Sequence, residues 1–428
     1  MKNLDAIAVI DIKNSIVVRA VAGKRNKYKE VESRILAKDE KSPLEVAAVF
    51  YKKLGIRKIY IADLDAILGN GSNLEDVKEI KEQYPDLEII LDAAFAENNS
   101  PIPYLKDFLD YAVIATETAA SFSFLKELEE FNSRIIISID LKAGNLIHNI
   151  KQWQDKNLED IISELTNFGI ENFIILDLAT VGTAAGISKY IKELKLNFPK
   201  LNFITGGGVK DYRDIKELKR MKFSGVLIAS AFHNGSIGKR EVALIENDDV
   251  LYQAAWCITG AGHLLEESIS EIEKILAEHK KLKIDIYLSK AAFEVLKIYK
   301  YYHRLESLNC EIHRDNSASS PVIGRIYKGY YDLLISAPTT SNTAAKFVLG
   351  ISDTLVSNLF AHAGKSKLPV VILPTDIDEN LVSAAPDKEV DVFPREIDLK
   401  NTEKLSQMAD TIVISKPEEV ESCLKEYL

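Results

Sequence analysis

The segment Tyr331–Asn358 reads YDLLISAPTTSNTAAKFVLGISDTLVSN and places a strand, a polar turn and a helix in direct succession. Its apolar run Leu333–Ala337 predicts a strand buried on both faces. Pro338 is expected to end that strand, because proline has no N–H group to give to a sheet ladder. A helical pattern begins at Ala344. Three turn residues are candidates for its N-cap: Ser341, Asn342 and Thr343.

Such a turn has a functional interpretation and a plain one. Free N–H groups and the helix dipole at a helix N-terminus favour an anion. An ordinary capped strand–turn–helix would show the same pattern, so the rest of the chain has to decide.

The composition is that of a globular protein with more than one domain. A length of 428 residues predicts two or three domains, and a net charge of −10 disfavours non-specific binding of nucleic acid. The three cysteines are far apart in the sequence, which disfavours a disulfide framework, a zinc ribbon or an iron–sulfur cluster, and we expect no metal. No apolar run is long enough to span a membrane, and Asp5 and Asp11 in the first apolar segment argue against a signal peptide. A cytoplasmic location is expected.

Short apolar segments alternate with amphipathic ones from Met1 to about Glu241. The predicted strands are Ala6–Ile10, Lys58–Ala62, Leu87–Leu91, Tyr111–Ala115, Ile135–Ile139, Phe173–Leu176, Leu201–Ile204 and Gly225–Ala229. Eight βα units of this spacing predict a (β/α)₈ barrel, and they fit a doubly wound open sheet less well.

Chemistry in such a barrel takes place where the strands end. Asp11 and Asp140 follow the first and fifth strands, on opposite sides of the mouth, and two carboxylates so placed can divide general acid and base roles. Strands seven and eight end in residues that suit a phosphate: Gly206, Gly207, Gly208, Ala229 and Ser230. The plain alternatives are helix N-capping for the aspartates and a tight turn for the glycines.

Four segments of the first half, VIDIKNSIVVRAVAG, SPLEVAAVFYKKLGIRKIYIADLDAILGNGSN, ISIDLKAGNLI and TGGGV, resemble the ribotide isomerase barrel of histidine biosynthesis, the ProFAR isomerase family. The resemblance implies that Asp11 and Asp140 are the general base and acid of an aldose–ketose rearrangement. That family binds a second phosphate at a glycine-rich turn after strand three. Here Asp92 and Glu117 follow strands three and four, and carboxylates there would repel a phosphate. We therefore expect one phosphate site and a different substrate, or a barrel that no longer catalyses.

A new pattern begins near Ile245–Asp249, so we predict a barrel domain at residues 1–245 and a second domain at residues 250–428. The second domain is expected to be a Rossmann-like α/β sandwich. Three of its strand ends carry small or hydroxylated residues, at Gly260–Gly262, Ser289 and Thr339–Thr343. With no acidic residue placed to hold a dinucleotide ribose, they suit a mononucleotide with one phosphate.

The motifs CITGAGHLLEES, APTTSNTAAKFVLGISDTLVSN and LPVVILP resemble the FMN-binding flavoprotein family, which includes homo-oligomeric flavin-containing decarboxylases. The decarboxylases carry a Pro-x-Met-Asn motif where this chain has Pro374-Thr375-Asp376, which disfavours decarboxylation. The TGAGH opening and Ser319–Arg325 (SSPVIGR) are similar to the archaeal branch called dihydromethanopterin reductase (acceptor).

This second resemblance implies FMN as cofactor, a pterin-type substrate, an external electron donor and a homo-oligomer. The residues expected to hold FMN are Gly260, Ala261, Gly262, Ser289, Pro338, Thr339, Thr340, Ser341, Asn342 and Thr343. Arg325 is a further candidate for gripping flavin or substrate, and Tyr327, Tyr330 and Tyr331 for stacking on a pterin. Two alternatives stay open: a barrel that only binds or scaffolds, and a flavin-dependent decarboxylase fused to a sugar-phosphate isomerase.

Overall fold

The structure, a computed structural model, describes residues 4–19, 29–37, 41–119, 121, 123–142, 144–179, 186–247, 250–316, 321–378, 381–384 and 388–427. The chain divides into two compact units, Met1–Asp248 and Asp249–Leu428, which are described separately below.

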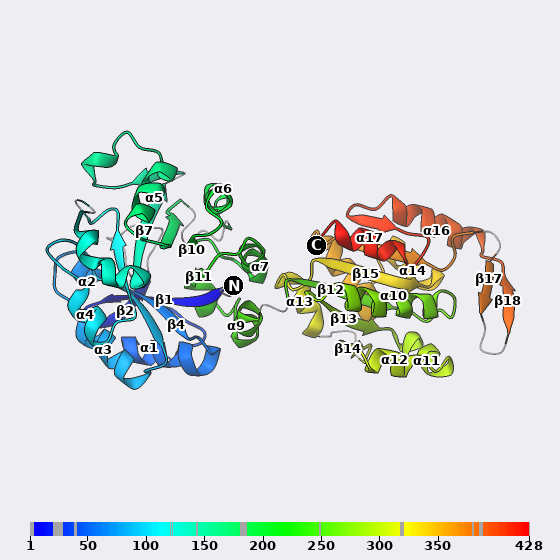
Figure 1. Ribbon diagram of the computed structural model, residues 1–428. Helices are drawn as coiled ribbons and strands as arrows, with labels where there is room; N and C mark the ends of the chain where they lie inside the picture. Colours follow the sequence, from blue (N-terminus) through cyan, green and yellow to red (C-terminus); the bar gives the residue numbers. More distant parts are fainter. Residues whose placement is uncertain are drawn as a thin grey trace. The chain divides into compact units, whose positions relative to one another are not determined.

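The first unit is a closed barrel of parallel strands with helices outside it (Figure 1). Its strands in spatial order are β1 (Asp5–Lys13), β4 (Lys58–Asp63), β5 (Glu88–Asp92), β6 (Tyr111–Ala115), β7 (Ile135–Lys142), β9 (Asn172–Asp177), β10 (Asn202–Gly206) and β11 (Gly225–Ile228). Pairing of β11 with β1 closes the ring, with Asp5 opposite Gly225. The predicted (β/α)₈ fold and its eight strands are confirmed.

Branched apolar side chains fill the barrel, as its parallel strands require. One buried cluster takes a residue from seven of the strands: Ile7, Ile90, Val113, Ile136, Ile174, Ile204 and Leu227. The outer helices are α1 (Pro43–Val49), α3 (Leu74–Gln83), α4 (Ile102–Asp107), α5 (Leu158–Asn167), α6 (Lys189–Asn197), α7 (Tyr212–Arg220) and α9 (Lys239–Glu246), with short α2 (Leu64–Ile67) and α8 (Ser230–His233) at strand ends. These helices cover the outer face, so the side chains at the strand ends are left to form a mouth.

Two barrel strands run on beyond the ring into hairpins that the sequence did not predict. β1 pairs with β2 (Ile16–Arg19), which in turn pairs with β3 (Lys29–Glu30). β7 pairs with β8 (Asn145–Ile147). The strands are longer than expected because these antiparallel partners satisfy their backbone groups past the barrel rim.

The second unit is a parallel six-stranded sheet between two helical layers (Figure 1). Its strand order is β14 (Glu311–Arg314), β13 (Leu282–Leu288), β12 (Tyr252–Ile258), β15 (Leu333–Thr339), β16 (Val370–Pro374) and β19 (Thr411–Val413). In chain order this is 3-2-1-4-5-6, the order of the doubly wound dinucleotide-binding fold. The predicted Rossmann-like sandwich is confirmed.

Helices cover both faces of this sheet. One apolar core joins the strands to α10 (Leu265–Glu278), α11 (Lys290–Ile298), α12 (Tyr302–Glu306) and α17 (Glu419–Lys425). The remaining helices are α13 (Gly324–Tyr327), α14 (Ser341–Leu349), α15 (Leu355–Lys365) and α16 (Glu396–Ser406). A separate hairpin pairs β17 (Leu381–Ala384) with β18 (Glu389–Val392). Across the described part of the chain, every helix is too short or too polar to cross a bilayer.

Two local predictions in the opening segment were wrong. β15 does not stop at Pro338 but continues to Thr339, because its pairing with β16 shifts register between Ser336 and Thr339. At such an irregularity the missing N–H of proline costs no ladder bond. The following helix starts at Ser341 rather than Ala344, and its N-cap is Thr340, whose hydroxyl accepts from the N–H of Thr343.

Candidate functional site

The mouth of the barrel holds a cavity of about 460 Å³ at the carboxyl ends of the strands. Six residues that the sequence singled out line it: Asp11, Asp140, Gly207, Gly208, Ala229 and Ser230. Gly206 has a packing role instead, because a Cβ there would lie 2.8 Å from the carbonyl oxygen of Leu227. One cavity therefore collects the proposed acid–base pair and most of the proposed phosphate site.

Asp11 and Asp140 lie on strands four places apart in the eight-stranded ring, and therefore on opposite sides of the mouth. Both occupy the extensions of their strands, where Asp11 pairs with Val18 and Asp140 with Ile147 in the hairpins. The backbone at each aspartate is therefore held by a strand on either side. Such backing is what a general acid or base needs to keep its position.

The glycine turn after β10 and the start of α8 form one wall of the cavity. Gly207 and Gly208 adopt φ angles of 74° and 104°, in the region that favours glycine. The Arg19 guanidinium donates to the Ser230 hydroxyl at 3.2 Å. Burial and this arginine lower the pKa of His233 to about 4, so its ring is neutral at pH 7. Arg19 is thus a cation beside the proposed phosphate site, and the sequence prediction missed it.

The opposite wall is acidic. Asp92 and Glu117, at the ends of β5 and β6, line the cavity, and the Tyr60 hydroxyl donates to Asp92 at 3.1 Å. Burial, then Asp92, Asp140 and Asp11, raise the pKa of Tyr60 well above its usual value. Tyr60 is thus a buried hydroxyl that lies near three carboxylates of the mouth, and its hydrogen bond to Asp92 holds one of them in place.

Two other aspartates at strand ends stabilise the local fold, as the alternative interpretation of helix capping predicted. Asp63 is fully buried, caps α2 through the N–H of Ala66 and accepts from Asn73 at 2.7 Å. Asp65 accepts from the N–H of Asn14 at 2.6 Å. Their hydrogen bonds hold the loop that follows β4 and the turn between β1 and β2.

In the second unit the proposed flavin site lies where the strand order reverses, between β12 and β15. Ligands of doubly wound sheets bind in the crevice at this point. The Thr259 hydroxyl joins the two sides, since it donates to the Pro338 carbonyl at 2.9 Å and accepts from the Thr340 N–H at 2.8 Å. The turn starting at Gly260 and the turn from Thr339 to Thr343 are therefore held side by side.

The residues of the second turn divide into two groups. Thr339 and Thr340 are engaged in the fold: the Thr339 hydroxyl bonds to Ser336 at 2.7 Å, and the Thr340 hydroxyl caps α14. Ser341 and Asn342 are not so engaged. The Ser341 hydroxyl is buried without a hydrogen-bond partner, and the exposed Asn342 side chain makes no hydrogen bond within the described part of the chain.

These two residues open α14, whose nine residues leave its first N–H groups pointing out of the helix end. A buried hydroxyl without a partner is unusual in native structures, and a ligand oxygen would satisfy it. The site therefore fits a phosphate or another polar edge of a mononucleotide such as FMN.

The other predicted flavin residues have structural reasons for their identity. A Cβ on Gly260 would overlap the Ala291 side chain and lie 3.1 Å from its backbone carbon, and a Cβ on Gly262 would overlap the Tyr299 hydroxyl. The Ser289 hydroxyl caps α11 by accepting from Ala292 at 3.0 Å. These residues shape the rim by allowing α11 to approach it closely.

Arg325, predicted as a candidate for gripping flavin or substrate, is paired with side chains of the fold. Its guanidinium bonds to Asp285 and Glu311, both at 2.7 Å, and lies 3.1 Å from His313. Tyr331 donates to the same Asp285 oxygen at 2.7 Å. Arg325 therefore forms structural ion pairs. Its guanidinium contacts Asp285, Glu311 and His313, three side chains whose ligand atoms lie close enough together to hold a metal ion.

The three tyrosines that were candidates for stacking on a pterin differ in their exposure. Tyr330 and Tyr331 are buried in the sheet unit, and Tyr331 contacts the Tyr287 hydroxyl at 2.5 Å. Tyr327 is half exposed and pairs with His362 at 2.5 Å. A Tyr just before an apolar strand looks the same in the sequence whether it belongs to the core or stacks on a ligand, so only the structure separates the two cases. The motif residues Ser319 and Ser320 lie outside the described residues.

Asp376 is a further candidate for a catalytic residue. The sequence analysis named it only because the decarboxylases have a different residue at this place in their Pro-x-Met-Asn motif. It follows β16, where the Thr375 N–H donates to the Thr339 carbonyl at 2.9 Å beside the proposed flavin turn. Burial, and to a lesser degree Asp398, raise the pKa of Asp376, while His263 opposes the shift. A carboxyl that keeps its proton above the ordinary range is suited to donating one.

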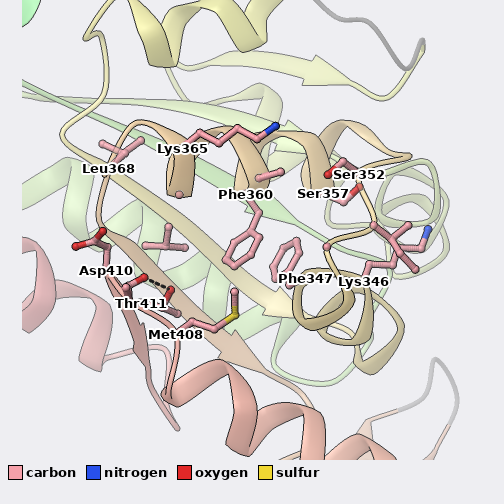
Figure 2. Close-up of a pocket in the computed structure, with 16 residues that line it drawn as sticks. Lys346, Phe347, Ser352, Ser357, Phe360, Lys365, Leu368, Met408, Asp410 and Thr411 are labelled. Atoms are coloured by element: carbon pink, nitrogen blue, oxygen red, sulfur yellow. Dashed lines mark hydrogen bonds between the residues drawn. The ribbon is translucent and has the colours of Figure 1, made fainter.

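A second, mainly apolar pocket of about 310 Å³ lies at the opposite edge of the sheet, where β16 and β19 begin. Figure 2 shows Phe347 and Phe360 face to face inside it, above Met408, with the Lys346 and Lys365 side chains extending away from the rings. The ring centroids are 4.0 Å apart. Its polar groups do not converge, so it is the weaker candidate for chemistry.

Comparisons with known proteins divide the chain in the same way. Residues 5–238 match the sequence model of the family described as Histidine biosynthesis protein, and residues 245–427 match that of the family Flavoprotein. Both resemblances expected from the motifs are confirmed.

Three relatives illustrate the two halves. A phosphoribosyl-substituted imidazole-4-carboxamide isomerase of Lactococcus lactis subsp. cremoris is 30% identical over 55% of this chain and 93% of its own length. The dihydromethanopterin reductase (acceptor) of Methanocaldococcus jannaschii is 40% identical over 30% of this chain and 55% of its own length. The crystal structure of Burkholderia xenovorans DmrB in complex with FMN is 39% identical, covering 41% of this chain and 94% of that one with a TM-score of 0.37.

Proposed function

The chain belongs to the histidine biosynthesis protein family through residues 5–238 and carries a flavoprotein-family unit at residues 245–427, and from this premise we propose an FMN-dependent oxidoreductase fused to a phosphate-binding barrel of isomerase type. The observation that carries the proposal is the crevice between β12 and β15, where the buried Ser341 hydroxyl has no hydrogen-bond partner among the residues that the structure describes. A phosphorylated cofactor lying across that crevice supplies the missing partner.

The residues that would hold FMN fall into two sets. Ser341, Asn342 and the first N–H groups of α14 receive the phosphate or the polar edge of the ring. The glycine turn from Gly260 to Gly262 lets backbone approach the ligand on the other side of the crevice. When bound, the cofactor supplies hydride chemistry, and the chain orients the substrate and excludes water.

The substrate proposed is a dihydropterin, dihydromethanopterin in the first instance, since a relative of the second unit carries that name. Its reduction adds a hydride to the carbon and a proton to the nitrogen of a C=N bond, giving the tetrahydropterin. Asp376 is the proposed proton donor, because its carboxyl lies at the strand end beside the crevice and has a raised pKa. An external electron donor then restores the reduced cofactor. We also propose that the chain acts as a homo-oligomer, as the flavoprotein resemblance implies.

Flavin binding provides the first test. Purified full-length protein should carry or take up FMN, seen as flavin absorbance and as FMN released on denaturation. Asn342→Ala should weaken FMN binding at least about tenfold, because a hydrogen bond to a charged group contributes about 1.5–3 kcal/mol. Asn309→Ala, an exposed asparagine before β14 at the other edge of the sheet, is the matched control. Equal affinity of both variants and wild type would place the flavin elsewhere.

For the barrel, we propose that Asp11 and Asp140 shuttle a proton between adjacent carbons of a phosphorylated substrate. One carboxylate removes the proton, and the other supplies a proton on the opposite side of the mouth. Asp11→Asn should abolish turnover of a phosphorylated aldose or aldosylamine while retaining its binding. An Asp11→Asn variant with unchanged turnover would favour the alternative, a barrel that only binds or scaffolds.

A further inference from the structure

We propose that the β17–β18 hairpin of one copy of this chain places Phe393, which directly follows β18, in the apolar pocket between α14 and α15 of a second copy. This inference rests on the homo-oligomer of the proposed function and names a surface through which the copies join.

The large apolar side chains that the second unit leaves exposed gather in two places. Among the described residues of this unit seven such side chains are exposed, and five of them lie at the pocket or the hairpin. Leu349 and Ile351 are beside the pocket, and Val382, Phe393 and Ile397 are on the hairpin or just after it. Phe393 is 71% exposed. Exposed apolar groups that cluster in this way mark a contact with a partner.

The hairpin stands apart from the main sheet (Figure 1), and one of its faces combines apolar and acidic side chains. Val382 lies opposite Asp391 in the hairpin register, so both side chains are on the same face. Because side chains alternate along a strand, Glu389 and Phe393 share that face. All four are exposed, whereas Val392 on the other face is half-buried. The exposed face therefore offers an aromatic ring beside two carboxylates.

The pocket is lined by groups that suit an aromatic side chain. Phe347 and Phe360 lie face to face inside it, with ring centroids 4.0 Å apart, above Met408 (Figure 2). The free volume of about 310 Å³ is bounded mainly by apolar side chains. Aromatic rings and thioethers are favourable neighbours for a further ring. A phenylalanine from outside therefore finds both space and partners there.

The charges at the pocket complement those of the hairpin face. Two lysines and one carboxylate, that of Asp410, are among the lining residues. Lys346 pairs with Asp353 at 2.9 Å, but Lys365 forms no ion pair with any residue that the structure describes. Asp391, two residues before Phe393, brings the opposite charge to this rim. Such complementarity orients a contact and favours one partner over others.

Within one copy the hairpin cannot fill the pocket. The two are separated by α16, a helix of 11 residues that starts three residues after Phe393 and ends two residues before Met408. A helix of this length spans about 16 Å. The pocket also lies where β16 begins, whereas the hairpin follows the end of β16. The occupant is therefore a second copy, and a contact between two different surfaces of identical copies can close into a ring.

Sedimentation velocity of the full-length protein with FMN, over a range of concentrations, tests this contact. Phe393→Ser should raise the dissociation constant of the assembly at least about tenfold, as the loss of an aromatic side chain from a pocket predicts. Gly364→Leu should do the same, because Gly364 lines the pocket and a side chain there meets open space in its own copy. Ile298→Ser, which removes another exposed apolar side chain, is the matched control and should leave assembly unchanged.

An exchange of charge tests the orientation of the contact. Lys365→Glu and Asp391→Lys should each weaken assembly, and the double variant should recover part of the loss, because the two opposite charges then meet again. A photoreactive benzoylphenylalanine in place of Phe393 should crosslink to α14 or α15 of a second copy, as identified by mass spectrometry. Crosslinks to any other surface, the hairpin of the second copy included, would refute the pocket as its site.

The outcomes separate this inference from the homo-oligomer on which it rests. If the wild-type protein is a monomer at every concentration, the homo-oligomer is wrong and the inference falls with it. If the protein assembles but Phe393→Ser and Gly364→Leu associate as tightly as Ile298→Ser, the contact is refuted and the copies join through another surface. Because Phe393 is exposed in a single copy, its substitution leaves the fold intact, and retained FMN binding checks this.

Discussion

Replacing Arg325 by methionine should destabilise the second unit by about 3 kcal/mol without acting through the flavin. The side chains of Arg325 and Asp285 are only 12% and 7% exposed. Removing one partner of a buried pair leaves the other charge uncompensated, which costs about 3–5 kcal/mol. We expect the lower end of this range, because Glu311 is 40% exposed and Lys283 lies 3.5 Å from Asp285.

The two tryptophans make this measurable for each unit separately, because Trp153 lies in the first unit and Trp256 in the second. In a Trp153→Phe background, urea unfolding followed by fluorescence reports the surroundings of Trp256, which is buried and bonded to the Ala337 carbonyl at 2.7 Å. Urea is preferred to guanidinium because a salt would screen the ion pairs.

Arg304→Met is the matched control, since Arg304 pairs with Glu273 at 2.6 Å on a more exposed surface. That loss should stay below about 1 kcal/mol. Adding Asp285→Asn to Arg325→Met should recover part of the stability, because the second change removes the stranded charge. An Arg325→Met protein as stable as the Arg304→Met control, but with weakened FMN binding, would return Arg325 to the ligand site and refute its structural role.

Three further predictions test other parts of the chain. Gly260→Ala should destabilise the second unit by about 1–3 kcal/mol, because the added methyl group would overlap Ala291. Gly364→Ala in α15, where the added methyl group meets open space, should cause no such loss, and the urea unfolding midpoints of the two variants are compared. The oxidative half-reaction, in which reduced flavin passes its hydride to a dihydropterin, should slow as pH rises above the ordinary carboxyl range, because protonated Asp376 is needed. Asp376→Asn should flatten this pH profile in stopped-flow measurements. The lowered pKa of His233, about 4, means that the folded barrel resists its protonation. Barrel stability should therefore be full above about pH 6.5 and fall towards pH 4, and His233→Gln should remove most of that slope in urea titrations at several pH values.

The sequence predicted those elements whose signal is local. Each barrel strand is an apolar run, because a parallel strand is covered on both faces, and all eight were found within a few residues of their ends. The edge strand Glu311–Arg314 was missed because its four residues, EIHR, contain a single apolar side chain. The hairpin of β17 and β18 was missed because it packs as a separate two-stranded piece outside the main sheet.

The candidate sites show the same contrast between local sequence signals, which could be predicted, and contacts between distant segments, which could not. In the run Thr339–Thr343 any hydroxyl can cap a helix, and the choice of Thr340 depends on Thr259, 81 residues away, which binds the N–H of Thr340. Arg325 looked like a ligand group because its partners Asp285 and Glu311 belong to strands that only the fold brings beside it. By contrast, Asp11 and Asp140 were found because strand order alone puts them across one mouth.

The bridge made by Thr259 has a consequence for how the protein is synthesised. Its hydroxyl meets the Pro338 carbonyl across 79 residues of sequence, so the flavin crevice cannot exist on a ribosome until both strands have emerged. The barrel, whose last strand pairs with its first and whose last outer helix ends at Glu246, can fold as a unit before then. A nascent chain that stalls between these points would carry a finished barrel and no place for a flavin, so the phosphate site forms first and the redox site last.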